Sequence, residues 1–319
     1  MRLSVAMCTY NGGRTLREQL QSIADQTRLP DEMVVCDDAS NDDTVQQLRD
    51  FIPNARFPVR LTVNAANVGS TANFANAIRL SDGDVIALSD QDDVWLPRKL
   101  ELIEQKLLQN PEAGFVFSDA EMVDEQRVPL RYGLWEAIAF TRGAQRQVTR
   151  GRAFDYLLRR YMATGATLAF RSCYRDTILP IPDCWVHDAW IALVISAFAS
   201  PVLIHDPLIE YRQHARQQIG EERRGLYGQY RFARSMGLRV FQREFETFSA
   251  AYDRLSGRLP RTVEPQKLAK LRHKVEHCRQ RLAMRGRSRL QRLPRIAGEL
   301  GRYRRYSLGW KSLAQDLFL

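Results

Sequence analysis

The chain has 319 residues, 45% hydrophobic and 26% charged, so it can bury a core as one large domain or as a domain with an appendage. Five cysteines occur singly, without a CxxC pair, which argues against a disulfide framework or a zinc site and favours a reducing cytoplasm. The start of the chain lacks the long apolar segment of a signal peptide. The best membrane-span candidate, 190–204, is too short and contains a proline, so we expect a buried helix that runs into a strand and no membrane span.

The net charge of +10 is unevenly distributed along the chain. Residues 221–319 hold 24 Lys and Arg against 9 Asp and Glu, whereas residues 1–220 hold 23 against 28. This contrast predicts an acidic globular domain over 1–220 and a basic, mainly helical region over 221–319. Within that region, residues 302–319 mix Arg with Leu, Phe, Tyr and Trp. Such a segment suits an anionic membrane surface, and a solvated helical cap on the domain is the alternative.

Strand-like and helix-like patterns alternate over the first ninety residues. The strand-like segments are 3–10, 32–38, 59–64 and 84–90. The helix-like segments are 14–27, 42–51 and 70–80. Apolar strands that alternate with helices predict an α/β fold with a mostly parallel sheet covered by helices on both faces.

The pattern continues less regularly after residue 90. We expect a helix over 97–110, a strand over 113–124 near an edge of the sheet, and a turn leading into a strand at 164–172. Beyond 221 we expect helices that are interrupted near 256–265 and at Pro294.

Polar loops follow the four expected strands, at 9–13, 37–43, 64–70 and 89–93. Each loop alone is an ordinary turn or helix start. The carboxyl ends of parallel strands meet at one edge of a sheet, where ligands bind in open α/β folds. Four such loops together therefore favour a binding site.

Asp90 and Asp92 follow the fourth strand directly. Mg²⁺ and Mn²⁺ prefer hard oxygen ligands and are usually held by one or two carboxylates together with substrate phosphates. The segment does not have the spacing of an EF-hand loop. We expect Asp90 and Asp92 to bind a divalent cation, Asp93 to cap the next helix, and Trp95 to pack in the core.

Asp37 and Asp38 form a second acidic pair at the neighbouring strand end. Carboxylates do not bind bare phosphate, so this pair is expected to accept hydrogen bonds from a base imide or a ribose hydroxyl. Thr9, Tyr10 and Asn11 can supply stacking and hydrogen bonds to the same base. The chain has no GxGxxG and no GxxxxGKS motif, which argues against a dinucleotide-binding or P-loop protein.

The segment CWVHDAW centres on Asp188, which lies where a helix is expected to begin and could simply be its N-cap. Trp185, His187 and Trp190 around one acid also suggest an aromatic-walled pocket that binds a sugar. Further along, His214 could be a neutral imidazole ligand, and Arg212 or Arg216 a phosphate clamp.

Six motifs follow one another along the chain: VAMCTYNGG, VVCDDASNDDT, NVGSTANFANAI, LSDQDDVWLPRKL, WVHDAW and YRQHARQQIG. In this order they resemble the motifs of family 2 glycosyltransferases with the GT-A fold, a Rossmann-like architecture, and most closely those of a bacterial rhamnosyltransferase-like branch. The match covers about residues 1–220, and the chain departs from the family pattern at 215–217.

This resemblance implies an inverting transferase that uses a nucleotide diphosphate sugar and Mg²⁺ or Mn²⁺. The implied nucleotide site comprises Thr9, Tyr10, Asn11, Asp37, Asp38, Asn67 and Asp90. The implied metal ligands are Asp90, Asp92 and His214, and Asp188 is the implied catalytic base. The implied donor or acceptor pocket comprises Gly165, Trp185, His187, Trp190 and Arg212.

The resemblance also suggests the substrates. A dTDP- or UDP-sugar is the expected donor, with rhamnose first, and a lipid-linked saccharide is the expected acceptor in cell-surface polysaccharide (O-antigen) synthesis. The basic tail would then lie on the cytoplasmic face of the inner membrane. Two alternatives stay open: a sugar-phosphate nucleotidyltransferase, and a non-catalytic protein whose tail contacts nucleic acid or membrane. The tail contains no recognised nucleic-acid module, so we expect no nucleic-acid partner.

Overall fold

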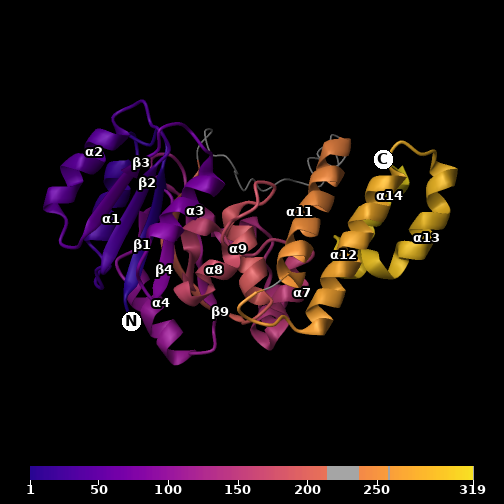
Figure 1. Ribbon diagram of the computed structural model, residues 1–319. Helices are drawn as coiled ribbons and strands as arrows, with labels where there is room; N and C mark the ends of the chain where they lie inside the picture. Colours follow the sequence, from indigo (N-terminus) through magenta and orange to yellow (C-terminus); the bar gives the residue numbers. More distant parts are fainter. Residues whose placement is uncertain (214–236, 258, 319) are drawn as a thin grey trace.

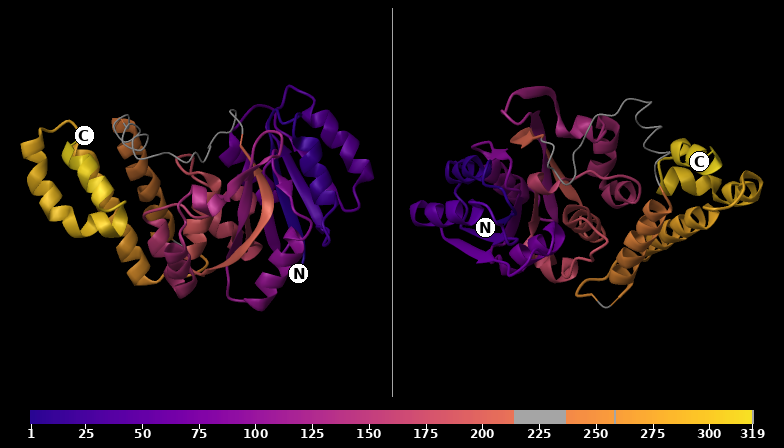
Figure 2. Two further views of the ribbon diagram at one scale, coloured as in Figure 1. Left: turned by 180° about the vertical axis from the view of Figure 1, so that it is seen from behind. Right: turned by 90° about the horizontal axis from the view of Figure 1, so that it is seen from above.

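A computed structural model describes residues 1–213, 237–257 and 259–318. The molecule has two parts, which Figure 1 shows side by side and the views of Figure 2 confirm. One part is a sheet with helices on both faces. The other is a group of helices near the C-terminus that extends away from the sheet. The expected boundary at 220/221 falls outside the described residues.

Within the described part of the chain, nine strands form one sheet in the order β3-β2-β1-β4-β8-β6-β9-β5, with β7 paired to β6. Neighbours among β1 to β4 run parallel, β6 and β9 run parallel to each other, and β8 runs antiparallel to β4 and β6. The mostly parallel sheet expected from the sequence is confirmed. The strands are β1 Leu3–Thr9, β2 Glu32–Asp37, β3 Val59–Val63, β4 Val85–Ser89, β5 Val94–Trp95, β6 Phe115–Val123, β7 Pro129–Gly133, β8 Leu168–Arg171 and β9 Pro201–Arg212.

Strands β1, β2 and β4 are buried on both faces, because helices cover the two sides to which successive residues of a strand point. Val5 and Met7 of β1 pack in a core formed with α1, α2 and α4, whereas Ala6 and Cys8 pack in a core formed with α3, α7 and α9. These helices are α1 Leu16–Ala24, α2 Thr44–Phe51, α3 Ser70–Leu80, α4 Lys99–Gln109, α7 Ala153–Leu157 and α9 His187–Ser196. Three short helices complete the domain: α5 Leu134–Ala137, α6 Arg142–Gln147 and α8 Arg175–Ile178.

One expectation about the elements is confirmed only in part, and another is wrong. Strand β6 is not an edge strand, because β8 and β9 pair with its two sides, although only β9 and the two-residue β5 separate it from one edge of the sheet. The C-terminal helices are not interrupted at Pro294, which lies inside α13; the chain turns instead at Gly286 and Gly309, both with positive φ. Trp95 is buried as expected, and the apolar segment after Asp188 forms α9 and then leads into β9.

The C-terminal helices are α11 Leu238–Ser256, α12 Pro265–Met284, α13 Arg289–Tyr306 and α14 Trp310–Phe318. Helix α11 is fastened to the sheet domain: Trp185 Nε1 donates to the carbonyl of Thr247 at 2.7 Å, and Arg254 donates to the carbonyl of Leu179 at 2.9 Å. Its Ala251 belongs to the same core as α9. Among the described helices, none is both long and apolar enough to cross a membrane.

Candidate active site

A cavity of about 640 Å³ opens at the carboxyl ends of β1, β2 and β4 and reaches the start of α9. Its position follows the rule for open α/β sheets. Eleven of the residues expected at the site lie on its wall: Thr9, Tyr10, Asn11, Asp38, Asn67, Asp90, Asp92, Gly165, His187, Asp188 and Arg212. His214 lies outside the described residues.

The Asp38 carboxylate holds the loop after β3 against the loop after β2. Its Oδ1 accepts hydrogen bonds from Asn64 Nδ2 and the backbone N–H of Val68, and its Oδ2 accepts one from the N–H of Gly69, each at 2.8 Å. Gly69 has a φ of +85°, a conformation that glycine adopts without strain. Asn67 Nδ2 contacts the Asp38 carbonyl at 3.4 Å.

Gln91, which the sequence reasoning missed, joins the loop after β1 to the acidic loop after β4. Its Oε1 accepts from the N–H of Tyr10 at 2.8 Å, and its Nε2 donates to the Tyr10 carbonyl at 3.0 Å. A Cβ on Gly12 would lie 2.3 Å from Gln91 Oε1, so this approach requires glycine. Asn11 makes a similar link to the loop after β2, where its Oδ1 accepts from the Asn41 N–H at 2.9 Å.

Asp37 does not face the cavity. Its side chain is fully buried and accepts hydrogen bonds from Thr9 Oγ1 at 2.7 Å and from the Ser40 N–H and Oγ at 2.8 and 2.6 Å. These contacts correct the expectation of a direct nucleotide contact. Asp37 positions the two loops, and Asp38 alone of the pair lies on the cavity wall.

Asp90 lies on the same wall as Asp92 and Asp188. Desolvation, followed by repulsion from Asp92 and Asp188, raises the pKa of Asp90 to about 7. Three carboxyl groups are therefore crowded at this end of the cavity and repel one another when they are ionised. A cation would relieve that repulsion.

Lys99 supplies a buried positive charge behind the acids, and the sequence reasoning did not identify it. Its Nζ donates to the carbonyl of Ala166 and lies 3.8 Å from the centre of the Trp95 ring. Burial lowers the pKa of Lys99 to about 7, opposed by attraction to Asp93 and Asp90. The helical spacing contains a signal, since Lys99 lies four residues before the buried Ile103 on the apolar face of α4.

Asp93 is not a helix cap. Helix α4 begins only at Lys99, after Arg98 at the N-cap position. Asp93 is buried, and its Oδ1 accepts from the Arg212 N–H at 3.3 Å. Burial and repulsion from Asp92 and Asp90 raise the pKa of Asp93 well above its usual range.

The Asp188 carboxylate is fixed by two backbone groups. Its Oδ2 accepts from the N–H of Gly165 at 2.8 Å, and its Oδ1 accepts from the N–H of Ala189 at 2.6 Å. Asp188 lies in the first turn of α9. The N-cap of this helix is Val186, two residues earlier, so the interpretation of Asp188 as the N-cap is wrong.

The two tryptophans do not line the cavity. Trp190 is fully buried, and its Nε1 donates to the Ile178 carbonyl at 2.7 Å, while Trp185 faces α11. The aromatic wall consists instead of His187 stacked on Phe74, with ring centroids 3.9 Å apart, together with Tyr161 and Tyr211. Helix α9 is buried almost throughout, so its apolar pattern does not indicate which side chains face the cavity.

The Arg212 guanidinium is occupied by protein groups. It donates to Glu18 Oε2 at 2.8 Å, to the Asp92 carbonyl at 2.9 Å and to the Glu125 carbonyl at 2.6 Å. These contacts hold the acidic loop after β4 in place. Arg212 therefore has a positioning role in place of the expected role as a phosphate clamp, and Arg216, the alternative clamp, lies outside the described residues.

The donor set fits a divalent cation that is shared with a phosphate ligand. Asp90 and Asp92 provide hard carboxylate oxygens on a wall where three carboxyl groups are crowded. Among the described residues, no group of three His, Cys, Asp or Glu side chains is placed to hold a metal alone. Further ligands would have to come from substrate oxygens or from outside the described residues, which is the usual pattern for Mg²⁺.

The solved structures similar to this chain support the fold. A structure of Staphylococcus aureus TarS 1–349 in complex with UDP-GlcNAc matches with a TM-score of 0.61 over 95% of this chain and 80% of that chain, at 15% identity. The Pyrobaculum calidifontis mannosyltransferase PcManGT, in complex with GDP-Man and Mn²⁺, matches with a TM-score of 0.55 over 99% and 84%, at 18% identity. The architecture is the GT-A fold.

Curated relatives match the N-terminal part of the chain. The Escherichia coli UDP-Glc:alpha-D-GlcNAc-diphosphoundecaprenol beta-1,3-glucosyltransferase WfgD is 28% identical over 126 residues, 40% of this chain and 48% of the relative. The uncharacterized glycosyltransferase YwdF of Bacillus subtilis is 32% identical over 133 residues, 41% and 47%. The chain thus spans less than half the length of either. The family model for glycosyl transferase family 2 matches residues 4–171, which is more than half of the chain, and the protein belongs to that family.

Proposed function

We propose that this protein is an inverting glycosyltransferase that moves a sugar from a nucleotide diphosphate donor to a hydroxyl of a saccharide acceptor. The observation that carries the proposal is one cavity with acids of two kinds on its wall. Asp90 and Asp92 form a cation-attracting pair, and Asp188 is a separate carboxylate held by backbone N–H groups.

Asp188 is the proposed base. It lies at the opening of α9, fixed through Gly165 and Ala189, so its position is set before any substrate binds. As the acceptor oxygen forms its bond to the anomeric carbon, the hydroxyl proton passes to Asp188. The bond from that carbon to the diphosphate oxygen breaks, and its electron pair leaves with the nucleotide diphosphate. Attack from the face opposite the leaving group inverts the configuration, and no covalent enzyme intermediate is required.

Asp90 and Asp92 are the proposed holders of Mg²⁺ or Mn²⁺. The ion would neutralise charge on the departing diphosphate when bound. On the protein side, Arg212 anchors the backbone of Asp92, and Gln91 anchors the loop to Tyr10. These contacts hold the pair in a defined position, which is what a cation with strict octahedral preferences needs.

Asp38 is the proposed contact for the nucleotide. Its Oδ1 already accepts two hydrogen bonds, whereas its Oδ2 accepts one from Gly69 and has a second lone pair for a base imide or ribose hydroxyl. Tyr10 is 44% exposed at the cavity wall, where its ring can stack on a base. Thr9 and Asn11 shape the same edge.

The hydrogen bonds of Gly12 and Gly13 argue against the phosphate-binding loop of a nucleotidyltransferase. The N–H of Gly12 donates to Thr44 Oγ1 at 2.8 Å, and the N–H of Gly13 donates to Asp42 Oδ2 at 3.1 Å. A phosphate-binding loop needs such N–H groups directed at its ligand. Here they are used to hold the loop after β2.

The proposed substrates are a dTDP- or UDP-sugar, with rhamnose first, and a lipid-linked saccharide in the synthesis of a bacterial surface polysaccharide. The name of the Escherichia coli relative, with its UDP-Glc donor and diphosphoundecaprenol-linked acceptor, supports this class of donor and acceptor. We place the protein on the cytoplasmic side of the inner membrane on the same ground.

A thermal-shift screen of nucleotide sugars with and without Mg²⁺ or Mn²⁺ tests the donor proposal, because a bound donor stabilises the fold by mass action. We expect stabilisation by one nucleotide class that depends on the cation. Stabilisation by nucleoside triphosphates with sugar phosphates, and none by nucleotide sugars, would instead indicate a nucleotidyltransferase and refute the proposal.

A further inference from the structure

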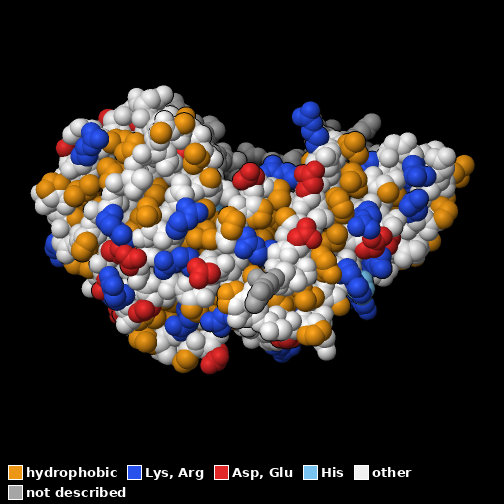
Figure 3. All heavy atoms as spheres, viewed as in Figure 1, with side chains coloured by type: hydrophobic (Ala, Val, Ile, Leu, Met, Phe, Trp, Pro, Cys, Tyr) orange, Lys and Arg blue, Asp and Glu red, His pale blue; other side chains and the backbone are white. Residues whose placement is uncertain are grey.

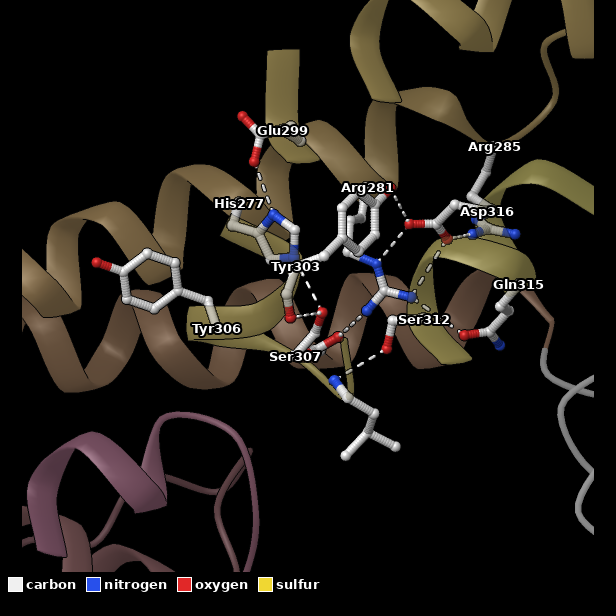
Figure 4. A network of polar contacts seen from close by, with 12 residues as sticks. His277, Arg281, Arg285, Glu299, Tyr303, Tyr306, Ser307, Ser312, Gln315 and Asp316 are labelled. Atoms are coloured by element: carbon white, nitrogen blue, oxygen red, sulfur yellow. Dashed lines mark hydrogen bonds and ion pairs between the residues drawn. The ribbon is translucent and has the colours of Figure 1, made fainter. Parts of the chain in front are cut away.

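The C-terminal helices α12 to α14 are held together by buried polar groups (Figure 4). His277 Nδ1 lies 2.7 Å from Glu299 Oε2, and Arg281 Nε donates to Asp316 Oδ2 at 2.7 Å. Tyr303 Oη also donates to Asp316 Oδ2 at 2.7 Å. Four of these five side chains come from α12 and α13, and Asp316 comes from α14. The inner surface of this unit is thus rich in charge.

Helix α13 turns most of its polar side chains toward that network. Arg292 donates to the Asp316 carbonyl at 3.2 Å, Arg295 to Gln280 Oε1 at 2.9 Å, and Arg302 to Glu299 Oε1 at 2.7 Å. Helical spacing places these residues with Glu299 and Tyr303 on one side of the helix. The opposite side is therefore depleted of polar groups.

That opposite side, the α13 outer face, is mostly apolar and exposed. It comprises Leu290, Leu293, Pro294, Ala297, Gly298, Leu300 and Gly301. Leu290 is 80% exposed, and Trp310 at the start of α14 is 74% exposed. A helix that only caps the domain would expose polar side chains to solvent, so an exposed apolar face argues against that alternative.

The exposed charges of the segment 285–318 have one sign. Arg287, Arg304, Arg305 and Lys311 are exposed around it. In the described segment 285–318 the two acids, Glu299 and Asp316, are both buried in the network. Figure 3 shows hydrophobic side chains together with Lys and Arg at this end of the molecule. Exposed leucines and a tryptophan flanked by arginines match a surface that lies in the headgroup layer of anionic lipid.

We propose that the α13 outer face docks on an anionic membrane surface. The inference deepens the proposed function, because a transferase with a lipid-linked acceptor must work at that surface. Charge favours lipid over a second copy of the chain, since two such faces would bring like charges together. The apolar centre of the face offers no donors for nucleic-acid phosphates. Compared with the expectation from the sequence, the docking residues shift from 302–319 toward the first half of α13.

The test uses the full chain in a flotation assay with two kinds of vesicle, phosphatidylglycerol mixed with phosphatidylcholine, and phosphatidylcholine alone. We expect binding to the anionic vesicles that weakens with salt. The triple variant L290S/L293S/L300S should lower the partition coefficient at least about 10-fold. R304Q/R305Q should lower it about 30-fold on the anionic vesicles alone, from about 1 kcal/mol for each Arg. Leu108→Ser, at an exposed leucine of α4, is the matched control and should bind as the parent does.

Sedimentation without lipid tests the alternative that a second copy of the chain, rather than lipid, docks on the α13 outer face. A parent chain that self-associates, with the triple variant monomeric and neither binding vesicles, would overturn the inference in favour of an interface between copies. Equal vesicle binding by the parent and the triple variant would also overturn it. Thermal unfolding and nucleotide-sugar binding of the triple variant should match the parent, because the changed leucines are exposed. A parent chain that binds a nucleotide sugar but no anionic vesicles overturns the inference and leaves the proposed function standing. A parent chain that binds the anionic vesicles but no nucleotide sugar refutes only the proposed function.

Discussion

The backbone N–H of Gly165 donates to Asp188 Oδ2 at 2.8 Å, so the turn before β8 holds the carboxylate that opens α9. This contact joins two segments more than twenty residues apart. It also keeps the second carboxylate oxygen, Oδ1, on the N-terminal side of the helix, where it accepts from Ala189. The proposed base is thus positioned by main-chain groups that no side-chain substitution removes directly.

Asp188→Asn should abolish sugar transfer while leaving donor affinity unchanged. The amide keeps the shape of the side chain but cannot accept the acceptor proton, so we expect kcat to fall about 10²- to 10⁴-fold. Steady-state kinetics and calorimetry with the donor measure the two quantities. Asp25→Asn, on the exposed end of α1, is the control. Transfer at the parental rate by Asp188→Asn would eliminate Asp188 as the base.

Gly165→Ala should impair catalysis through the position of the base. A Cβ there would lie 2.8 Å from His187 Nε2 and 3.6 Å from Asp188 Oδ2, so His187 and the turn must shift. We expect kcat to fall about 10- to 100-fold with a smaller change in donor KM, because misplacement of reacting groups costs about that much. At Gly143 an added Cβ would meet its nearest atom at 3.8 Å, so Gly143→Ala should be neutral. Equal kinetics for the two variants would contradict this view of the turn.

Lys99→Met should destabilise the fold. The substitution keeps a long apolar stem against Trp95 but removes the buried cation near Asp93 and Asp90. Loss of the hydrogen bond to the Ala166 carbonyl and of the amino group near the buried acids should lower the free energy of unfolding by roughly 1–3 kcal/mol. Urea unfolding measures it, with Lys106→Met on the same helix as the control. A loss no larger than that of the control would show that Lys99 does not compensate the acids.

The ionisation of Asp90 predicts a pH dependence of stability in the absence of metal. Its pKa is raised to about 7 in the folded protein, so between about pH 4 and pH 7 the folded state binds more protons than the unfolded state. The free energy of unfolding should therefore fall as the pH rises through this window. Asp90→Asn should flatten the fall. Saturating Mn²⁺, which binds the ionised carboxylate, should reduce the fall, most strongly toward pH 7, where more of Asp90 is ionised. A parent and an Asp90→Asn variant with parallel pH profiles would contradict the assignment.

Local patterns predicted the first half of the fold because β1, β2 and β4 are apolar runs that are buried at every position, and helices α1 to α4 each bury one side. The position of β6 could not be predicted in this way. Its neighbours β8 and β9 come from 168–171 and 201–212, and no local signal reports pairing over that distance.

The candidate site could also be predicted only in part from the sequence. Asp38, Asp90 and Asp188 were predicted from acids at strand and helix ends, and the cavity brings them together. Asp93 was assigned to a helix cap because the boundary of α4 was placed too early. The assignment of Trp190 to the cavity was wrong. Helix α9 is buried almost throughout, so its apolar pattern does not show which side of the helix faces the cavity.

Gln91 is the connection that no sequence pattern indicated, and its removal tests the pre-arranged site. Gln91→Ala deletes both hydrogen bonds to the Tyr10 backbone, at 2.8 and 3.0 Å, and frees the loop after β1 from the acidic loop. We expect a rise of about 10-fold in donor KM, the loss of roughly 1.4 kcal/mol from two hydrogen bonds that order the nucleotide edge. Gln91→Glu retains an acceptor for the Tyr10 N–H but adds charge beside Asp90 and Asp92, so its donor KM should depend more steeply on cation concentration. Gln105→Ala, at an exposed position of α4, controls for the loss of a glutamine, and a donor KM that is the same in Gln91→Ala as in that control would show that the two loops hold their places without Gln91.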